Sequence, residues 1–190
     1  MQKFKVKVTG LTPYMQHRMD DQKLIDWEKS RGQIIENQGI NTEPEKMALF
    51  HSYVTPDGNF YIPSEHFKQC FLNGGKAIKG KVGTATKSMK QVVAGQFFVT
   101  PAMIPFRKFD VVDRRSVVNK LTKARVICTR PMWLTPWDVE FVLEVHNDTV
   151  TQETIKSILE YGGNFVGVGS YRPEHAGEYG RFNVTLEKIK

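Results

Sequence analysis

Apolar and polar residues alternate along three stretches of the chain, a period of two that is typical of strands with one buried face. The alternation is clearest in residues 3–9 and 137–146, where a polar side chain follows almost every apolar one. Residues 181–188 alternate in the same way, and residues 124–129 form a shorter apolar run of the kind found in buried strands. The pattern therefore predicts four strands.

Two further segments repeat apolar residues every three to four positions, which is the period of a helix with one buried side. Residues 151–162 begin with Thr151, a favourable N-cap, and end with Gly162, a favourable stop. Residues 64–75 show a shorter version of the pattern that ends in two glycines. We expect a helix in each segment.

In chain order these elements read strand, helix, strand, strand, helix, strand. That order predicts an α+β fold with a ferredoxin-like (RRM-like) β-α-β-β-α-β core. We expect residues 1–190 to form a single domain, in which residues 14–62 and 76–123 are large insertions. Function is expected in the insertions, because binding residues concentrate on loops that a rigid core positions.

The composition fits a folded globular protein that needs no stabilising disulfide, metal or cofactor. The chain has 190 residues, of which 40% are hydrophobic and 25% are charged. Its two cysteines, Cys70 and Cys128, lie far apart, and no histidine stands at metal-ligand spacing from either. The start of the chain has no signal-peptide pattern, and no apolar run is long enough to span a bilayer, so we expect a cytoplasmic protein.

Positive charge is concentrated in the middle of the sequence. The net charge is +7, and residues 64–130 alone hold 14 Lys and Arg against 3 Asp and Glu. No acidic residue occurs between His66 and Phe109. A field of one sign indicates a polyanionic partner such as a nucleic-acid backbone, and a solvated lysine-rich face is the alternative.

A glycine-rich stretch precedes the last predicted strand. Residues 162–180 contain six glycines, and Tyr171, Arg172, Tyr179 and Arg181 accompany them. Glycines let the backbone approach a partner closely and point N–H groups at phosphate oxygens, while tyrosine and arginine stack on bases. A loop that uses glycine only to turn is the alternative. A dinucleotide-binding site is excluded, because that motif follows a strand and opens a helix.

Three pieces of the sequence, in this order, resemble the RAMP superfamily, the RNA-binding proteins of CRISPR effector complexes, and especially its Cas7-like backbone branch. The first is the opening strand that runs into Gly10-Leu11-Thr12-Pro13. The second is Tyr61-Ile62-Pro63-Ser64 followed by Lys68, and the third is the glycine-rich loop before the final strand.

The resemblance implies that copies of the protein stack along an RNA strand and that an inserted hairpin reaches over it. Residues 76–90 and 111–123 are the candidates for such a hairpin. In the type III branch of the family, an aspartate after the first strand cuts RNA. Asp20, Asp21 and Asp26 lie in that region, but no flanking motif singles one out, and we assign no catalytic role.

We therefore expect a non-catalytic, single-stranded RNA-binding, Cas7-like backbone subunit of a CRISPR-type ribonucleoprotein complex or filament that serves antiviral defence. The expected partners are single-stranded nucleic acid and further subunits or copies of the same chain. The expected contact residues are basic, aromatic or glycine positions: His17, Arg18, Lys68, Lys76, Lys79, Lys81, Lys87, Lys90, Arg114, Arg115, Gly167, Gly169, Tyr171, Arg172, Tyr179 and Arg181.

Two other functions stay open. One is a Cas6-like, metal-independent endoribonuclease, for which His17 and Arg18 supply the best pair of a base and a cation. The other is a phage single-stranded DNA-binding or assembly protein whose basic segment meets nucleic acid only incidentally.

Overall fold

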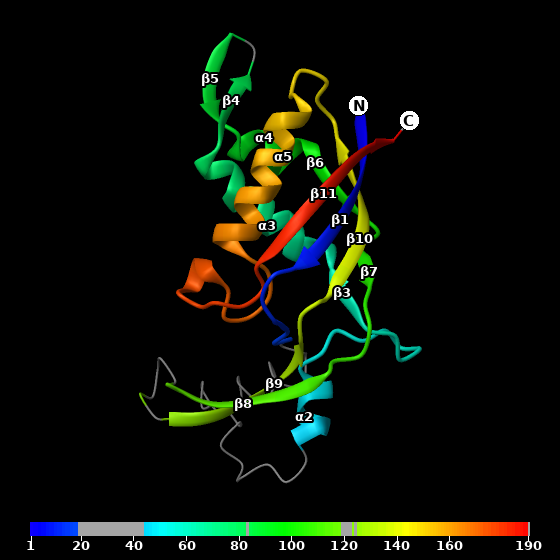
Figure 1. The fold of residues 1–190 in the computed structure, drawn as a ribbon, viewed down its shortest axis with the longest axis vertical. Coiled ribbons are helices and arrows are strands. Elements are labelled where there is room, and N and C mark those ends of the chain that lie inside the picture. Colours follow the sequence, from blue (N-terminus) through cyan, green and yellow to red (C-terminus); the bar gives the residue numbers. More distant parts are fainter. Residues whose placement is uncertain (19–43, 83, 119–122, 124, 190) are drawn as a thin grey trace, which may run out of the picture.

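The largest layer of the protein is a four-stranded antiparallel sheet with the order β11-β1-β10-β6 (Figure 1). The computed structural model describes residues 1–18, 44–82, 84–118, 123 and 125–189. The four strands are β1 (Gln2–Gly10), β6 (Phe97–Thr100), β10 (Asp138–Val145) and β11 (Phe182–Ile189). With helices packed on this sheet, the fold class is α+β, as the sequence predicts.

The alternation in β1 decides which face of the sheet is buried. Phe4, Val6 and Val8 are completely buried, whereas the lysines between them point to the open face. On that face the Lys5 ammonium lies 2.9 Å from a Glu140 carboxylate oxygen of the neighbouring strand. Apolar residues inward and paired charges outward are the expected result of a period of two.

Helices cover the buried face (Figure 1): α3 (Ser64–Ala77), α4 (Lys90–Gln96) and α5 (Gln152–Tyr161). The hydroxyl of Thr151 accepts a hydrogen bond from the Thr154 amide at 3.2 Å and caps α5. The helix then passes into a π-helical turn, Gly162–Val166. The predicted helix over residues 151–162 and its N-cap are confirmed.

Helix α3 continues past the two glycines that were expected to end it. A Cβ atom on Gly74 would lie 2.6 Å from the Ile158 carbonyl oxygen of α5, and one on Gly75 would lie 2.9 Å from Val93 Cγ2 of α4. The glycines therefore allow close packing of three helices, and the helix extends to Ala77.

The second strand of the main sheet is not the one that the sequence predicts. The run 124–129 was expected there, but that segment belongs to a separate sheet, and the edge of the main sheet is β6, inside the expected insertion 76–123. The separate sheet has the order β2-β9-β8, and its strands are β2 (Tyr14–Met15), β9 (Arg125–Trp133) and β8 (Val111–Val118). A local apolar pattern specifies a strand but not its partner, which explains the exchange.

A cluster of aromatic rings joins the two sheets. The Tyr14 ring lies 5.4 Å from each of the Trp133 and Trp137 rings and 5.7 Å from the Phe106 ring, measured between centroids. Trp137 Nε1 also donates to the Thr12 carbonyl at 2.8 Å. These contacts fix the course of the chain directly after β1, where the candidate site begins.

The remaining elements are short, and three of them lie at the ends of the molecule. They are α2 (Pro44–Phe50), β3 (Tyr61–Pro63), β4 (Lys79–Val82), β5 (Ala85–Ser88) and β7 (Met103–Pro105). Figure 1 shows the β4–β5 hairpin at the upper end, and α2 with β8 and β9 at the lower end. Within the described ranges, no helix is long and apolar enough to cross a membrane.

Candidate nucleic-acid interface

One buried amide holds the segment that follows β2. Gln16 is 1% exposed; its Nε2 donates to the Tyr61 carbonyl at 2.9 Å, and its Oε1 accepts from the Tyr53 amide at 2.8 Å. Because both ends of the side chain are bonded to the same neighbouring segment, His17 and Arg18 are held beside it. The Arg18 guanidinium lies 6.0 Å from the Tyr53 ring centroid.

The first turn of α3 brings an imidazole to the same region. The His66 ring meets the Tyr53 ring edge-on, with centroids 5.2 Å apart, and its Nδ1 is buried with no hydrogen-bond partner. Burial first, and then the positive charge of Arg172, lower the pKa of His66 to about 4. The imidazole is therefore neutral at neutral pH and interacts as a hydrogen-bond donor and acceptor rather than as a cation.

The glycine-rich loop is folded closely onto the protein. Gly167, Gly169 and Gly180 have positive φ values of 74°, 78° and 69°, a region that side chains disfavour. A Cβ atom on Gly180 would lie 1.8 Å from the Val168 carbonyl oxygen. Both the backbone angles and the lack of space therefore require glycine.

Two of the loop amides that were expected to face phosphate are bonded inside the protein. The Gly167 amide donates to the Gly162 carbonyl at 2.8 Å, and the Gly180 amide donates to the Pro13 carbonyl at 2.8 Å. Close packing, rather than an array of free N–H groups, accounts for these glycines. The expectation is corrected for both amides.

The guanidinium of Arg172 is bonded to other groups of the loop. Its Nε and Nη2 donate to Glu174 Oε2 at 3.0 and 2.9 Å, and its Nη1 donates to the Gly169 carbonyl at 3.1 Å. Glu174 also accepts from Asn73 Nδ2 at 2.5 Å, which ties the loop to α3. The predicted phosphate contact is therefore a group that positions the loop, and little of its charge is left for a ligand.

The inner face of the β8–β9 hairpin packs on two tyrosines of the loop. The Arg115 guanidinium lies 4.8 Å from the Tyr171 ring centroid and 5.2 Å from that of Tyr179. It also forms a bidentate pair with Asp113, which is the main reason that the pKa of Arg115 is raised. The guanidinium of Arg130 approaches the same Tyr171 ring, 4.7 Å from its centroid. Rings that were expected to stack on bases thus join the loop to the hairpin.

Arg130 differs from Arg115 because no carboxylate of the described residues forms an ion pair with it. Its side chain is 6% exposed, its Nε donates to His17 Nδ1 at 3.4 Å, and its Nη1 is buried with no hydrogen-bond partner. Within the described residues, neither Arg130 nor Arg18 has an ion pair. A buried cation without a counter-ion costs several kcal/mol, so an anion beside Arg130 would stabilise it.

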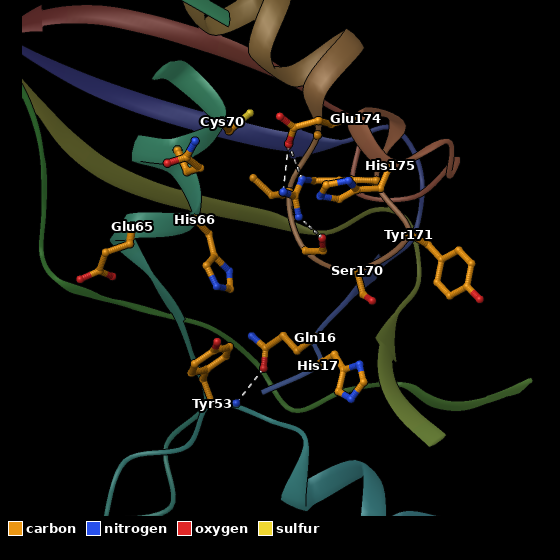
Figure 2. A pocket seen from close by; sticks show the side chains of 15 residues that line it. Gln16, His17, Tyr53, Glu65, His66, Cys70, Ser170, Tyr171, Glu174 and His175 are labelled. Atoms are coloured by element: carbon orange, nitrogen blue, oxygen red, sulfur yellow. Dashed lines mark hydrogen bonds and ion pairs between the residues drawn. The ribbon is translucent and has the colours of Figure 1, made fainter. Parts of the chain in front are cut away.

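These side chains surround an open hollow of about 620 Å³, the central hollow (Figure 2). It is lined by residues 16–17, Tyr53, several residues of 65–70, and most of 167–175. The imidazoles of His17, His66 and His175 all belong to its wall. In Figure 2 the His66 ring points toward Tyr53 and Gln16.

Half of the predicted contact residues gather around this hollow. Five of them line it: His17, Gly167, Gly169, Tyr171 and Arg172. Three others contact residues of its wall: Arg18, Arg115 and Tyr179.

Five predicted lysines lie on a second feature, the basic arm, which comprises the β4–β5 hairpin of residues 79–88 and the flanking positions 76 and 90. All five are exposed, and in the part of the chain that the structure describes they form no ion pair: Lys76, Lys79, Lys81, Lys87 and Lys90. Figure 1 shows the arm at the opposite end of the long axis from β8 and β9. The positive charge of the expected insertion 76–123 is therefore not gathered on one surface, because the arm and β8 both belong to that insertion and lie at opposite ends of the molecule.

Lys68 is enclosed by main-chain carbonyl groups. Its ammonium donates to the carbonyls of Val93 at 2.5 Å and Ala94 at 3.0 Å, and to that of Phe97. Burial lowers the pKa of Lys68. Since an ammonium has three donors, this lysine caps the end of α4 and has none left for phosphate, which corrects its assignment.

The two remaining predicted arginines lie away from the wall of the hollow. Arg181 is half-buried, and its Nε donates to the Asn164 carbonyl at 3.1 Å. Arg114 is exposed on the face of β8 opposite to that of its neighbour Arg115, because successive side chains of a strand alternate.

Several residues of the region were not predicted as contacts, among them Gln16, Tyr53, His66, Arg130 and His175. Arg130 had a detectable signal, since it is a charged residue within an apolar strand sequence. The others had none, because only the tertiary fold brings the start of α3 beside the glycine-rich loop. Asp20, Asp21, Asp26 and Lys120 lie outside the described residues.

The chemistry available in the hollow consists of hydrogen bonding, ring contacts and positive charge. Burial raises the pKa of the Cys70 thiol, which keeps it protonated and a weak nucleophile. Within residues 1–18, 44–82, 84–118, 123 and 125–189, no group of three or more His, Cys, Asp or Glu side chains could hold a metal ion.

Comparisons with known proteins yield structural similarity and no family. No protein-family model and no curated protein sequence matches this chain. Among solved structures, a similar one is a chain described as "Type IV-B CRISPR Complex", with 12% identity and a TM-score of 0.47. The match covers 97% of this chain and 90% of that chain. Because the TM-score is below 0.5, the similarity assigns neither a family nor a function to the protein.

Proposed function

We propose that the protein binds single-stranded nucleic acid, with RNA preferred over DNA, in the central hollow and along the basic arm. It does so without cutting the strand, as one subunit of a larger assembly. By the resemblance of its motifs, that assembly is a CRISPR-type ribonucleoprotein in which this chain is a Cas7-like backbone subunit on a ferredoxin-like core.

One observation carries the proposal. Two guanidinium groups that form no ion pair with another described residue, those of Arg18 and Arg130, flank a hollow whose wall includes aromatic and imidazole rings as well as the carboxylates of Glu65 and Glu174. Cations beside ring faces and neutral polar groups are what an unpaired strand requires, since its phosphates need charge and its bases need flat surfaces. The exposed lysines of the basic arm add a second contact to the backbone.

The three resembling motifs also meet in space around this hollow. In the segment after β1, the Pro13 carbonyl accepts a hydrogen bond from the Gly180 amide of the loop. The Thr12 hydroxyl accepts a hydrogen bond from the Arg181 amide at 3.0 Å. The Tyr61 carbonyl is bonded to Gln16 of the same segment. Motifs that are distant in sequence are thus joined by hydrogen bonds around one hollow, which supports the proposal of a single site.

The test is a binding titration by fluorescence anisotropy with a labelled single-stranded RNA, the same sequence as single-stranded DNA, and an RNA duplex. We expect the RNA single strand to bind most tightly and its affinity to fall steeply as salt rises from about 50 to about 200 mM. The double variant Arg18→Gln/Arg130→Gln should lose about tenfold or more in affinity, because charge-assisted hydrogen bonds are the strongest single contacts.

The matched control is Lys5→Gln/Lys7→Gln, which removes the same charge from the open face of β1. It should bind within about twofold of the wild type, because screening confines the effect of exposed charges to about 10 Å. An equal loss in both variants, or no binding by the wild type, would contradict the proposal.

A metal-independent ribonuclease is the second candidate, because three imidazoles line one hollow. Such cleavage needs a base near a 2′-hydroxyl and a cation for the developing charge, and His17 with Arg130 3.4 Å away has that composition. Wild-type protein that leaves labelled RNA intact at all pH values would exclude it. A His17→Ala variant that binds RNA but fails to cut it would support it.

A further inference from the structure

The starting observation is a buried hydrogen-bonding group that the protein leaves unused. His66 Nδ1 is buried and has no hydrogen-bond partner among the residues that the structure describes, while the ring points into the central hollow (Figure 2). Leaving such an atom unpaired costs about 1–3 kcal/mol, so native structures seldom tolerate it without a reason.

Three polar side chains of the wall are already committed to other partners. Both ends of the Gln16 amide are bonded to the main chain, the Arg172 guanidinium is bonded to Glu174, and Gln69 Nε2 donates to Asn73. His66 Nδ1 is free to meet something that enters the hollow.

The chemistry of the site selects the class of ligand. A neutral imidazole offers one donor and one acceptor, and it lies against the edge of the Tyr53 ring, a flat aromatic surface in the same wall. A phosphate requires positive charge, which this ring does not supply. A planar heterocycle with its own donors and acceptors satisfies both the imidazole and the aromatic surface.

The volume of the hollow limits how many planar heterocycles it can hold. Its volume of about 620 Å³ lies within the range of sites that enclose one small organic ligand, roughly 300–1,000 Å³. One unstacked base with its sugar fits this range, whereas a duplex does not. Arg18, beside Tyr53, is placed to contact the adjoining phosphate.

We infer that the central hollow admits one unstacked base of the bound strand and reads its hydrogen-bonding edge through His66. The inference rests on the proposed function and adds to it. A protein that grips only phosphates carries no sequence code, whereas a base held by His66 gives one position of the strand a preference.

The experiment compares single-stranded RNA homopolymers of equal length, oligo-U, oligo-A and oligo-C, by fluorescence anisotropy at fixed salt. We expect the best and the worst of the three to differ by at least about fivefold, because a good pair of hydrogen bonds to a base discriminates by 1–3 kcal/mol. His66→Phe retains a ring but no hydrogen-bonding atom, and it should bring all three affinities to that of the weakest. The control is His146→Phe, which changes an exposed imidazole directly after β10. This variant should keep the preference.

The outcomes separate the two proposals. Equal binding of all three homopolymers by the wild type, or a preference that survives in His66→Phe, overturns base reading and leaves the proposed function standing. No binding to any of them removes the proposed function itself. If His66→Phe does not fold, the ¹⁵N shifts of the His66 ring in wild-type protein decide: they should move with an uncharged nucleoside, and no movement with adenosine, cytidine or uridine overturns the inference.

Discussion

The basic arm and the central hollow both carry predicted contact residues, but they hold their cations in different ways. The lysines of the arm are exposed on a hairpin and have no ion pairs among the described residues. Around the hollow, Arg115 and Arg172 are paired with carboxylates and bonded to the loop, whereas Arg18 and Arg130 form no ion pair with any residue that the structure describes.

The difference shows that a count of Lys and Arg in the sequence does not separate cations that are paired with carboxylates from cations that remain available for a ligand. Paired arginines at the hollow stabilise the fold, so substituting them should mainly lower the free energy of unfolding. Unpaired cations contribute little to the fold and remain available for an anion, so their substitution should be felt first in binding. Substitutions matched between the two regions test this distinction.

The largest effect is expected from the same glycine substitution made in each region. In Gly180→Ala the new Cβ would lie 1.8 Å from the Val168 carbonyl oxygen at a φ of 69°, so the backbone of the hollow must move. We expect a loss of about 3 kcal/mol or more in the free energy of unfolding. In Gly80→Ala on the arm, the nearest atom is the flexible Met89 Sδ at 2.6 Å, and we expect a loss of about 1 kcal/mol or less. Urea denaturation of both variants measures the difference, and equal losses would contradict it.

The second effect concerns the arm alone. Lys79→Ala/Lys81→Ala/Lys87→Ala should leave stability within about 0.5 kcal/mol of the wild type, because the three side chains are exposed and unpaired. Affinity for single-stranded RNA should fall about ten- to a hundredfold, and the slope of log affinity against log salt should decrease by about 2. The loss should be the same for every sequence. Lys3→Ala/Lys5→Ala/Lys7→Ala on the open face of β1 is the control of equal charge; a similar loss there would show that the arm has no special role.

The sequence predicted the parts of the fold that depend on local patterns. Alternation in residues 3–9 gave β1 and its buried face, and Thr151 with the apolar stripe behind it gave α5. Both signals are local, because a strand face or a helix cap is decided within a few residues.

The parts that depend on tertiary partners could not be predicted. Within the predicted run 124–129, residues 125–129 form a strand, but it pairs with β8 rather than with β10, and a pattern with a period of two does not encode that choice. The glycines of the loop are visible in the sequence, but the close approach of Val168 to Gly180 that requires a glycine arises only in the folded chain. For the same reason the sequence could not show which arginines would find a carboxylate.

The third effect compares a paired with an unpaired arginine on one face of the β8–β9 hairpin. Arg115→Met leaves Asp113, whose side chain is 9% exposed, without its guanidinium, and we expect a loss of about 2 kcal/mol in the free energy of unfolding. Arg130→Met removes an uncompensated buried charge and should be neutral or stabilising by up to about 1 kcal/mol, although the residue is almost fully buried. Thermal and urea denaturation measure both. A larger loss for Arg130→Met than for Arg115→Met would show that Arg130 has a role in the fold that its contacts do not reveal.

The smallest effect is a dependence of stability on pH that comes from the hollow and not from the arm. The folded protein keeps His66 neutral because its pKa is lowered to about 4, whereas the unfolded chain takes up a proton near the ordinary value of 6.5. Protons therefore favour the unfolded state between these values, and stability that is present above pH 6.5 is lost as the pH falls toward 4. Relative to His66→Phe, which cannot titrate, the wild type should lose about 1–2 kcal/mol between about pH 7 and about pH 5. Urea titrations of both proteins at a series of pH values measure this difference, and parallel profiles would mean that His66 is protonated as readily in the folded protein as in the unfolded chain.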